Sequence, residues 1–424
     1  MSQKTPTNAT KEEAKPTLVP KLRFPEFRGD DGWELSQLGT FLTESRLPGS
    51  KGDVAKKITV KLWGNGVFEK NDAIQGSVNT QYFQRKAGQF IYSKLDFLNQ
   101  AFGVVPPSLD NFESTVDLPC FDIAEGLNPV FLLEYVKRKD FYERVGEAAD
   151  GSRKARRIHA ETFLSFSVGL PSTTEQQKIA DCLSSVDELI AAQARKVDAL
   201  KTHKKGLMQQ LFPTEGETQP RLRFPEFRDA GDWEEITLGE LVEVASGQVD
   251  PTQQPYCDMP HIGGENIESD TGNLQGVKTA SELGLISGKY LFDGSNVLYS
   301  KIRPALNKVA LPDFVGICSA DIYPIRPANQ RLDRIYLAYL LFSNTFLKYA
   351  TKHSARSKIP KINRDSLLAY QLFIPCLPEQ NRIASCLTSL DDLITAATQE
   401  LDTFKTHKKA LMQQLFPSAP GTAP

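Results

Sequence analysis

Two triplets in the chain combine a phenol, a hydroxyl and a cation in the same order, each at the end of a short apolar run. The first is Tyr92, Ser93 and Lys94, and the second is Tyr299, Ser300 and Lys301. Lysine binds phosphate or donates to guanine, while serine and tyrosine hydroxyls bond to the nucleic-acid backbone or to bases. Ordinary solvation of a strand end is the alternative for either triplet alone. Because the triplets recur at matching positions, the pattern favours contacts with DNA.

Further basic residues gather after these triplets. The second triplet continues into Arg303 and Lys308, around turns set by Pro304 and Pro312 and with no acidic residue before Asp313. A second basic cluster follows in each half of the chain, at Arg153, Lys154, Arg156 and Arg157, and at Arg356, Lys358 and Lys361. Each cluster comes shortly before a long helical segment. A solvated face is the alternative, but the recurrence favours phosphate contacts near the start of each helix.

The sequence lacks the motifs that would indicate catalysis. The segment 284–290 has the wrong spacing for a phosphate-binding loop, and Tyr290 stands where serine or threonine would contact magnesium. Pro106 and Pro107 lack the flanking residues of an adenine methyltransferase motif, and Pro312 lacks the acidic element of metal-dependent nucleases. The five histidines show no metal-ligand spacing. The sequence therefore predicts no catalytic residue, no metal site and no cofactor in this chain.

Composition sets the broad class of protein. The 424 residues, 40% hydrophobic and 24% charged, are enough for two or more folded domains. A net charge of -2 means that nucleic-acid binding would depend on local basic clusters. The six cysteines contain no C-x-x-C pair, which favours a reducing compartment, and no apolar run is long enough to span a membrane. We therefore expect a cytoplasmic protein.

The chain contains an internal repeat. Residues 21–39, KLRFPEFRGDDGWELSQLG, recur as residues 221–239, and residues 175–213 recur as residues 379–417 with KTHKK and LMQQLFP identical. Between these shared segments lie two divergent stretches, 41–160 and 241–362. A shared frame that carries two different regions is typical of a protein that recognises two different targets.

The repeated segments 175–213 and 379–417 are rich in helix-forming residues and have apolar positions at alternating spacings of three and four. The first seam is Leu183, Val186, Ile190, Gln193, Val197, Leu200, Lys204, Leu207 and Leu211. The second is Leu387, Leu390, Ile394, Ala397, Leu401, Phe404, Lys408, Leu411 and Leu415. This pattern predicts two long helices that pack together as a coiled coil. The polar seam residues either fix the register or lie exposed near the seam ends.

The predicted length of these helices exceeds one turn of a DNA duplex. About 37 helical residues span roughly 55 Å, whereas one turn of B-DNA is roughly 34 Å. Domains held by such helices could contact separated half-sites on one duplex. A coiled coil used only for assembly, without DNA, is the alternative.

With these motifs in place, the chain resembles the specificity subunits of type I restriction-modification systems from Lys21 to Pro417. The resemblance rests on RFPEF followed by Trp and Leu-Gly, on Pro followed by Glu-Gln and Ile-Ala at 171–180 and 375–384, and on the helix ending KKGLMQQLF. It implies two target-recognition domains, each binding one half of an interrupted DNA site, with two antiparallel helices setting the spacer. The stretch 297–311, similar to a recurrent segment of such domains, implies that Lys301, Arg303 and Lys308 face DNA. The first region departs from it, with Leu95 and Asp96 in place of Ile302 and Arg303.

The resemblance also implies partners. Two modification subunits would bring S-adenosylmethionine and adenine methylation, and restriction subunits would bring ATP, magnesium, translocation and cleavage. The shared helices and the RFPEF segments would dock the modification subunits. Two alternatives stay open: a scaffold that assembles DNA-modifying enzymes without base recognition, and a stand-alone methyltransferase or nuclease.

The predicted fold is α+β (mixed α/β), with two recognition domains separated by two antiparallel helices that form a coiled coil. The expected boundaries are a disordered tail at 1–20, a first recognition domain at 21–170, a central helix at 171–213, a second domain with its linker at 214–374, a C-terminal helix at 375–417 and a disordered tail at 418–424.

Overall fold

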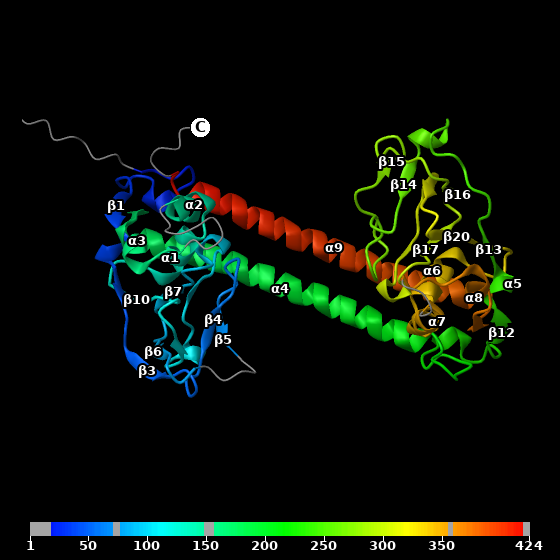
Figure 1. Ribbon diagram of the computed structural model, residues 1–424, viewed down its shortest axis with the longest axis horizontal. Coiled ribbons are helices and arrows are strands. Elements are labelled where there is room, and N and C mark those ends of the chain that lie inside the picture. Colours follow the sequence, from blue (N-terminus) through cyan, green and yellow to red (C-terminus); the bar gives the residue numbers. More distant parts are fainter. Residues whose placement is uncertain (1–17, 71–76, 148–156, 355–358, 419–424) are drawn as a thin grey trace, which may run out of the picture. The chain divides into compact units, whose positions relative to one another are not determined.

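The computed structural model describes residues 18–70, 77–147, 157–354 and 359–418. The chain divides into two compact units: one extends to Gln193 and resumes at Glu400, and the other is Ala194–Gln399. Both boundaries fall within the long helices α4 (Thr173–Leu211) and α9 (Leu377–Leu415), each 39 residues long (Figure 1). Each unit therefore contains one divergent region and part of both helices. In the described ranges, no helix is long and apolar enough to cross a bilayer.

The first unit is built on an antiparallel sheet with the strand order β2-β10-β7-β8. Its strands are β2 (Leu42–Glu44), β10 (Cys120–Ile123), β7 (Phe90–Tyr92) and β8 (Phe102–Val104). A three-stranded sheet and a hairpin add β3 (Pro48–Lys51), β6 (Gln81–Gln84), β9 (Glu113–Ser114), β4 (Ile58–Val60) and β5 (Val67–Glu69). The helices before α4 are α1 (Pro129–Val136), α2 (Lys139–Glu147) and α3 (Ala160–Ser165).

The second unit repeats the main sheet with the order β13-β20-β17-β18. Its strands are β13 (Val242–Val244), β20 (Ile322–Pro327), β17 (Val297–Ser300) and β18 (Val309–Ala310). The other sheet differs from that of the first unit and contains β15 (Lys278–Thr279), β14 (Pro260–Ile262), β19 (Gly316–Cys318) and β16 (Tyr290–Phe292). Within the two divergent regions, the main sheet is thus repeated, whereas the sheet that accompanies it has a different topology.

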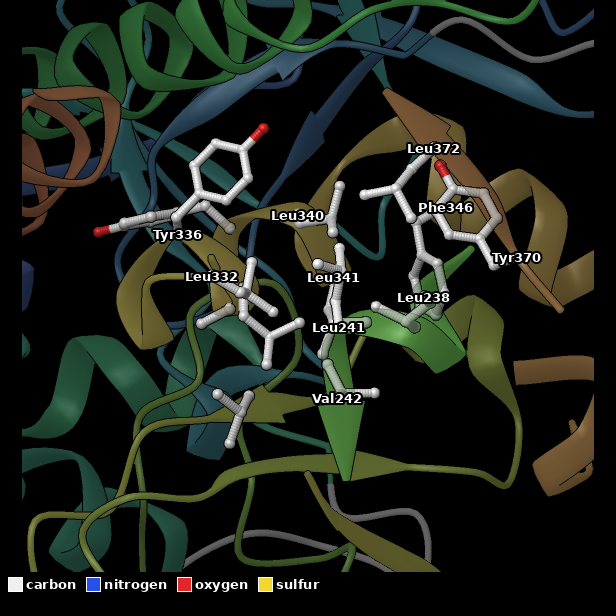
Figure 2. Close-up of a cluster of buried hydrophobic side chains, with 14 of the residues drawn as sticks. Leu238, Leu241, Val242, Leu332, Tyr336, Leu340, Leu341, Phe346, Tyr370 and Leu372 are labelled. Atoms are coloured by element: carbon white, nitrogen blue, oxygen red, sulfur yellow. The ribbon is translucent and has the colours of Figure 1, made fainter. Parts of the chain in front are cut away.

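Apolar side chains from several elements form the core of the second unit. Figure 2 shows residues of α5 (Leu238–Leu241), β13, α6 (Arg334–Phe342) and α7 (Asn344–Ser354) packed around one another. Helix α6 begins where the Asp333 carboxylate accepts a hydrogen bond from the backbone N–H of Tyr336 at 2.7 Å, as helix N-caps do. Asn128 caps α1 of the first unit in the same way. The repeat therefore extends to helices whose sequences differ.

Each unit is closed by a short two-stranded sheet that joins its two shared segments. The strands are β1 (Glu34–Gln37) with β11 (Ser167–Leu170), and β12 (Glu234–Thr237) with β21 (Gln371–Ile374), which follows α8 (Arg364–Leu368). Residues 18–20 of the predicted N-terminal tail are ordered, because Leu18 and Trp33 exchange backbone hydrogen bonds at 3.4 and 2.7 Å. The rest of that tail, and residues 419–424 of the other, lie outside the described residues.

The long helices pair antiparallel within each unit. In the first, Lys408 of α9 bonds to Asp187 of α4 at 2.7 Å, and Gln193 donates to Glu400 at 2.8 Å, so residue numbers rise on one helix as they fall on the other. In the second unit, Lys204 contacts both carboxylate oxygens of Asp391 at 2.6 and 2.7 Å. All predicted seam residues are buried or half-buried, which confirms the coiled coil. The polar seam residues make bonds across the helix pair.

Candidate nucleic-acid interface

The two triplets occupy equivalent positions in the two main sheets. Lys94 and Lys301 each donate a backbone hydrogen bond at 2.9 Å, to Asp117 and Asp321 respectively. The same backbone hydrogen bond closes the turn after each triplet. The N–H of Ser93 donates to the carbonyl of Ala101 at 3.0 Å, and the N–H of Ser300 donates to the carbonyl of Lys308 at 3.0 Å. The alignment made from sequence therefore corresponds to one repeated structural feature.

The tyrosines of the triplets lie in the cores, which corrects their predicted contact with DNA. Tyr92 is 0% exposed and Tyr299 is 2% exposed. The Tyr92 hydroxyl donates to the carbonyl of Ile158 at 3.1 Å, and its ring stacks on Phe121. Burial raises the pKa of both phenols well above the usual value, so both stay neutral. Their role is to pack the strand end that carries the lysine.

The serines of the triplets shape the turns and are also turned away from solvent. The Ser93 hydroxyl lies 3.2 Å from an Asp96 carboxylate oxygen and accepts from the Asp96 backbone N–H at 3.2 Å. The Ser300 hydroxyl donates to the carbonyl of Ile302 at 3.3 Å. Both residues are buried, at 8% and 3% exposed. The structure thus gives them a positioning role in place of the predicted DNA contact.

The basic residues of the triplet turns differ in how firmly they are held. Lys94 is half-buried and Arg303 is exposed. The Lys301 ammonium donates to the carbonyl of Ala320 at 2.6 Å, and that of Lys308 donates to the carbonyl of Gly264. Arg303 has a φ of 46°, in the left-handed region, and its backbone N–H donates to Pro360 at 2.7 Å. The backbone therefore holds an exposed guanidinium in a conformation that residues other than glycine rarely adopt.

The described ends of the two basic clusters lie beside the triplet turns. Ile158 donates a backbone hydrogen bond to Lys94 at 3.0 Å, which places Arg157 next to that turn, and Arg157 pairs with Asp117 at 3.3 Å. Ile362 donates likewise to Lys301 at 2.9 Å, and Lys361 forms a β-bridge with Ile302. Each unit therefore brings together basic residues that are about 60 positions apart in the sequence.

Along the chain, other elements separate the described ends of the basic clusters from the long helices. A short helix and a strand, α3 and β11, follow Arg157 before α4 begins, and α8 and β21 follow Lys361 before α9. The predicted contacts Arg153, Lys154, Arg156, Arg356 and Lys358 lie outside the described residues.

Sequence reasoning missed a hairpin that is attached to the first triplet turn. The loop between β4 and β5 donates two backbone hydrogen bonds to that turn, from Trp63 to Asn99 and from Gly64 to Gln100, both at 2.8 Å. The signal was the Gly-Asn-Gly run at 64–66 between two apolar runs, since such dipeptides mark tight hairpins. In the second unit the matching turn is bonded instead to the loop of Asp270, whose carboxylate accepts from Asn307 at 2.9 Å.

Among the described residues, no group of three or more His, Cys, Asp or Glu side chains is arranged to hold a metal ion. His261 is buried, and neither ring nitrogen has a hydrogen-bond partner there. The candidate interface is therefore made of basic and apolar side chains on two repeated turns.

Comparisons with known proteins agree with this architecture. Residues 230–403 match the family model described as type I restriction modification DNA specificity domain. The chain is 31% identical over 241 residues to the type I restriction enzyme EcoDI specificity subunit of Escherichia coli, a match that covers 51% of this chain and 53% of that protein. The chain thus spans about half the length of that relative.

Two solved structures share the fold. One is the S subunit of a type I restriction-modification system from M. genitalium, at 14% identity and a TM-score of 0.60, covering 95% of this chain and 100% of that one. The other, from work on complex assembly and conformational transition of the type I restriction-modification system, has 17% identity and a TM-score of 0.55, and covers 91% of this chain and 98% of that one.

Proposed function

We propose that this chain is a specificity subunit of the type I restriction-modification family, and that it binds a two-part DNA sequence with one half-site for each unit. One observation carries the proposal. In each unit a repeated backbone feature, the triplet turn, presents basic residues from separate parts of the sequence at one place. In the second unit these residues are Lys301, Arg303 and Lys361.

The differences between the two turns support two different half-sites. Leu95 and Asp96 stand where the second unit has Ile302 and Arg303, although the flanking backbone bonds are the same. Guanidinium groups donate to guanine in the major groove, whereas apolar side chains contact the thymine methyl. The same frame with different side chains would therefore favour different bases.

The chain itself is proposed to be non-catalytic. Two modification subunits would supply S-adenosylmethionine and methyl transfer, and restriction subunits would supply ATP- and magnesium-dependent translocation and cleavage. The shared RFPEF segments and long helices would dock the modification subunits, because they are the parts that the two units have in common. The solved structure from work on complex assembly in a type I system supports a subunit role for this fold.

The test is to map methylated adenines genome-wide in cells that carry this chain with its modification subunits. The expected result is one interrupted sequence that is methylated only when the chain is present. Methylation at an uninterrupted sequence would contradict two-part binding, and methylation without any sequence preference would support the scaffold alternative. Methyl transfer by the purified chain alone would contradict a non-catalytic role.

A further inference from the structure

The tip of the hairpin formed by β4 and β5 carries an exposed aromatic side chain in an unfavourable backbone conformation. Trp63 is 64% exposed and has a φ of 59°. It is followed by Gly64, with a φ of 67°, and Asn65 donates back to the carbonyl of Leu62 at 3.3 Å. Positive φ at both central residues is the requirement of a type I′ turn, which favours Asn, Asp or Gly at the position of Trp63.

A tryptophan at this position conflicts with local preference in two ways. Its Cβ disfavours the left-handed region, and its large apolar surface stays in water. Strained residues of this kind concentrate at binding sites, where the surrounding structure holds them. The strained backbone and the exposed ring of Trp63 therefore indicate a binding role for this residue.

The surrounding structure holds the turn firmly. The backbone N–H groups of Trp63 and Gly64 donate to Asn99 and Gln100 at 2.8 Å, and Lys61 donates to Gly66 at 2.9 Å. Asn99 and Gln100 belong to the same β7–β8 turn that contains Lys94. Trp63 is thus presented from a tethered loop on the turn that the proposed function assigns to the first half-site.

The charge around Trp63 points to a polyanion. Residues 56–70 contain four lysines and one acidic residue. Lys61 is two residues before Trp63, and its Nζ lies 4.2 Å from the ring centroid of Phe68, which is itself 44% exposed. Apolar side chains flanked by cations match the chemistry of DNA, where the cations neutralise phosphates and the aromatic ring stacks on a base or inserts at a base step.

We propose that Trp63 contacts DNA by stacking on a base, or inserting at a base step, in the half-site bound by the first unit. The inference rests on the proposed function and adds a residue that determines recognition. A protein partner at the same turn is the competing occupant, and the test below separates the two.

The first measurement uses tryptophan fluorescence. The chain has three tryptophans, of which Trp33 and Trp233 are 1% and 4% exposed, so the solvent-exposed emission comes from Trp63. The probe is duplex DNA carrying the methylated sequence, added to the chain assembled with its modification subunits. The difference between the wild-type complex and a W63F complex isolates Trp63. We expect quenching and loss of accessibility to iodide on addition of DNA; an unchanged difference spectrum would overturn the proposal.

The second measurement uses W63N, because asparagine tolerates the left-handed region and removes the ring. Duplexes are selected from a random pool by wild-type and W63N complexes, and the second half-site serves as the internal control. The expected result is a melting temperature no lower than that of the wild type, with affinity for the first half-site reduced about tenfold or more, as loss of a stacked ring implies. The second half-site should be selected unchanged.

The remaining outcomes are distinguishable. If W63N selects both half-sites as well as the wild type, Trp63 is not a DNA contact, while the proposed function stands. If W63N loses the modification subunits and the fluorescence does not respond to DNA, the turn binds a protein, which also overturns the inference. If the wild-type complex selects no bases at all, the proposed function itself fails.

Discussion

Arg223 places Nε and Nη2 at 2.8 Å from the two carboxylate oxygens of Glu379, so that a fork of two parallel bonds joins the RFPEF segment to the first turns of α9. Arg23 makes the same fork with Glu175 on α4, at 2.9 and 2.7 Å. The Glu175 and Glu379 side chains are each 1% exposed. In each unit, the RFPEF segment therefore supplies the arginine of a buried ion pair, and the Glu-Gln motif at the start of the long helix supplies the glutamate.

Removing one partner of this pair should be costly. In R223M the Glu379 carboxylate stays buried without its counter-charge, so we expect a loss of about 3–5 kcal/mol in the stability of the second unit. Hydrogen exchange of β21 and of the start of α9 measures it. The control is R326M, which removes an exposed pair with Glu243, and should cost less than about 1 kcal/mol. Equal effects of the two variants would contradict the structural role of the fork.

The bond between Lys204 and Asp391 should stabilise the helix pair through its two charges together. Lys204 is 15% exposed at its side chain, and Asp391 also accepts from the Tyr339 hydroxyl at 2.8 Å. We expect K204M and D391L each to destabilise, and the double variant to cost less than their sum by about 1 kcal/mol, since neither charge is then left alone. Thermal unfolding of the wild type, the two single variants and the double variant measures these stability differences. A strictly additive result would show that the lysine is only solvated; K405A, in the exposed pair with Asp402, is the control.

Acid should weaken the second unit through His261. Burial lowers the pKa of this histidine below the ordinary 6.5, and Lys289 lowers it further. As the pH falls below about 6.5, the histidine of the unfolded chain therefore binds a proton before that of the folded chain. The free energy of unfolding is highest above that pH and declines below it, by at most about 1.4 kcal/mol for each pH unit. Hydrogen exchange of β14 between pH 7.5 and 5.5 follows the decline. H261F should flatten it, and a wild-type slope in H261F would exclude His261 as the cause.

Arg303 should contribute to DNA affinity without being needed for folding. R303G removes the guanidinium and accepts the positive φ, so the fold should be kept while affinity for the methylated sequence falls about tenfold, the effect of one good side-chain contact. If Arg303 contacts a phosphate, R303G should reduce the slope of log affinity against log salt concentration by about one. If Arg303 contacts a base, R303G should relax the base preference at one position of the half-site. R331A, whose guanidinium pairs with Glu234 at 2.6 Å, is the control in the same unit. Equal affinities of R303G and wild type would remove Arg303 from the interface.

The repeat and the helix seam could be predicted because they depend on spacing alone, and the seam residues are indeed covered. The roles of Tyr92 and Tyr299 could not, because the strands that carry them are buried on both faces and show no alternation. The meeting of Arg157 with Lys94, and of Lys361 with Lys301, depends on backbone pairing between distant segments, which no local pattern indicates. The position of Trp63 could not be predicted because tryptophan disfavours the positive φ that this turn requires, so the residue type gives no turn signal.

Exchange of a single divergent region is the most direct test of whether one chain carries two independent DNA-recognition regions. Residues 241–362 would be replaced by the matching region of a relative, and both complexes would select duplexes from a random pool. We expect two short base blocks with a fixed gap, of which only one changes after the exchange. Selection of one continuous block, or a change in both blocks, would rule out two independent recognition regions.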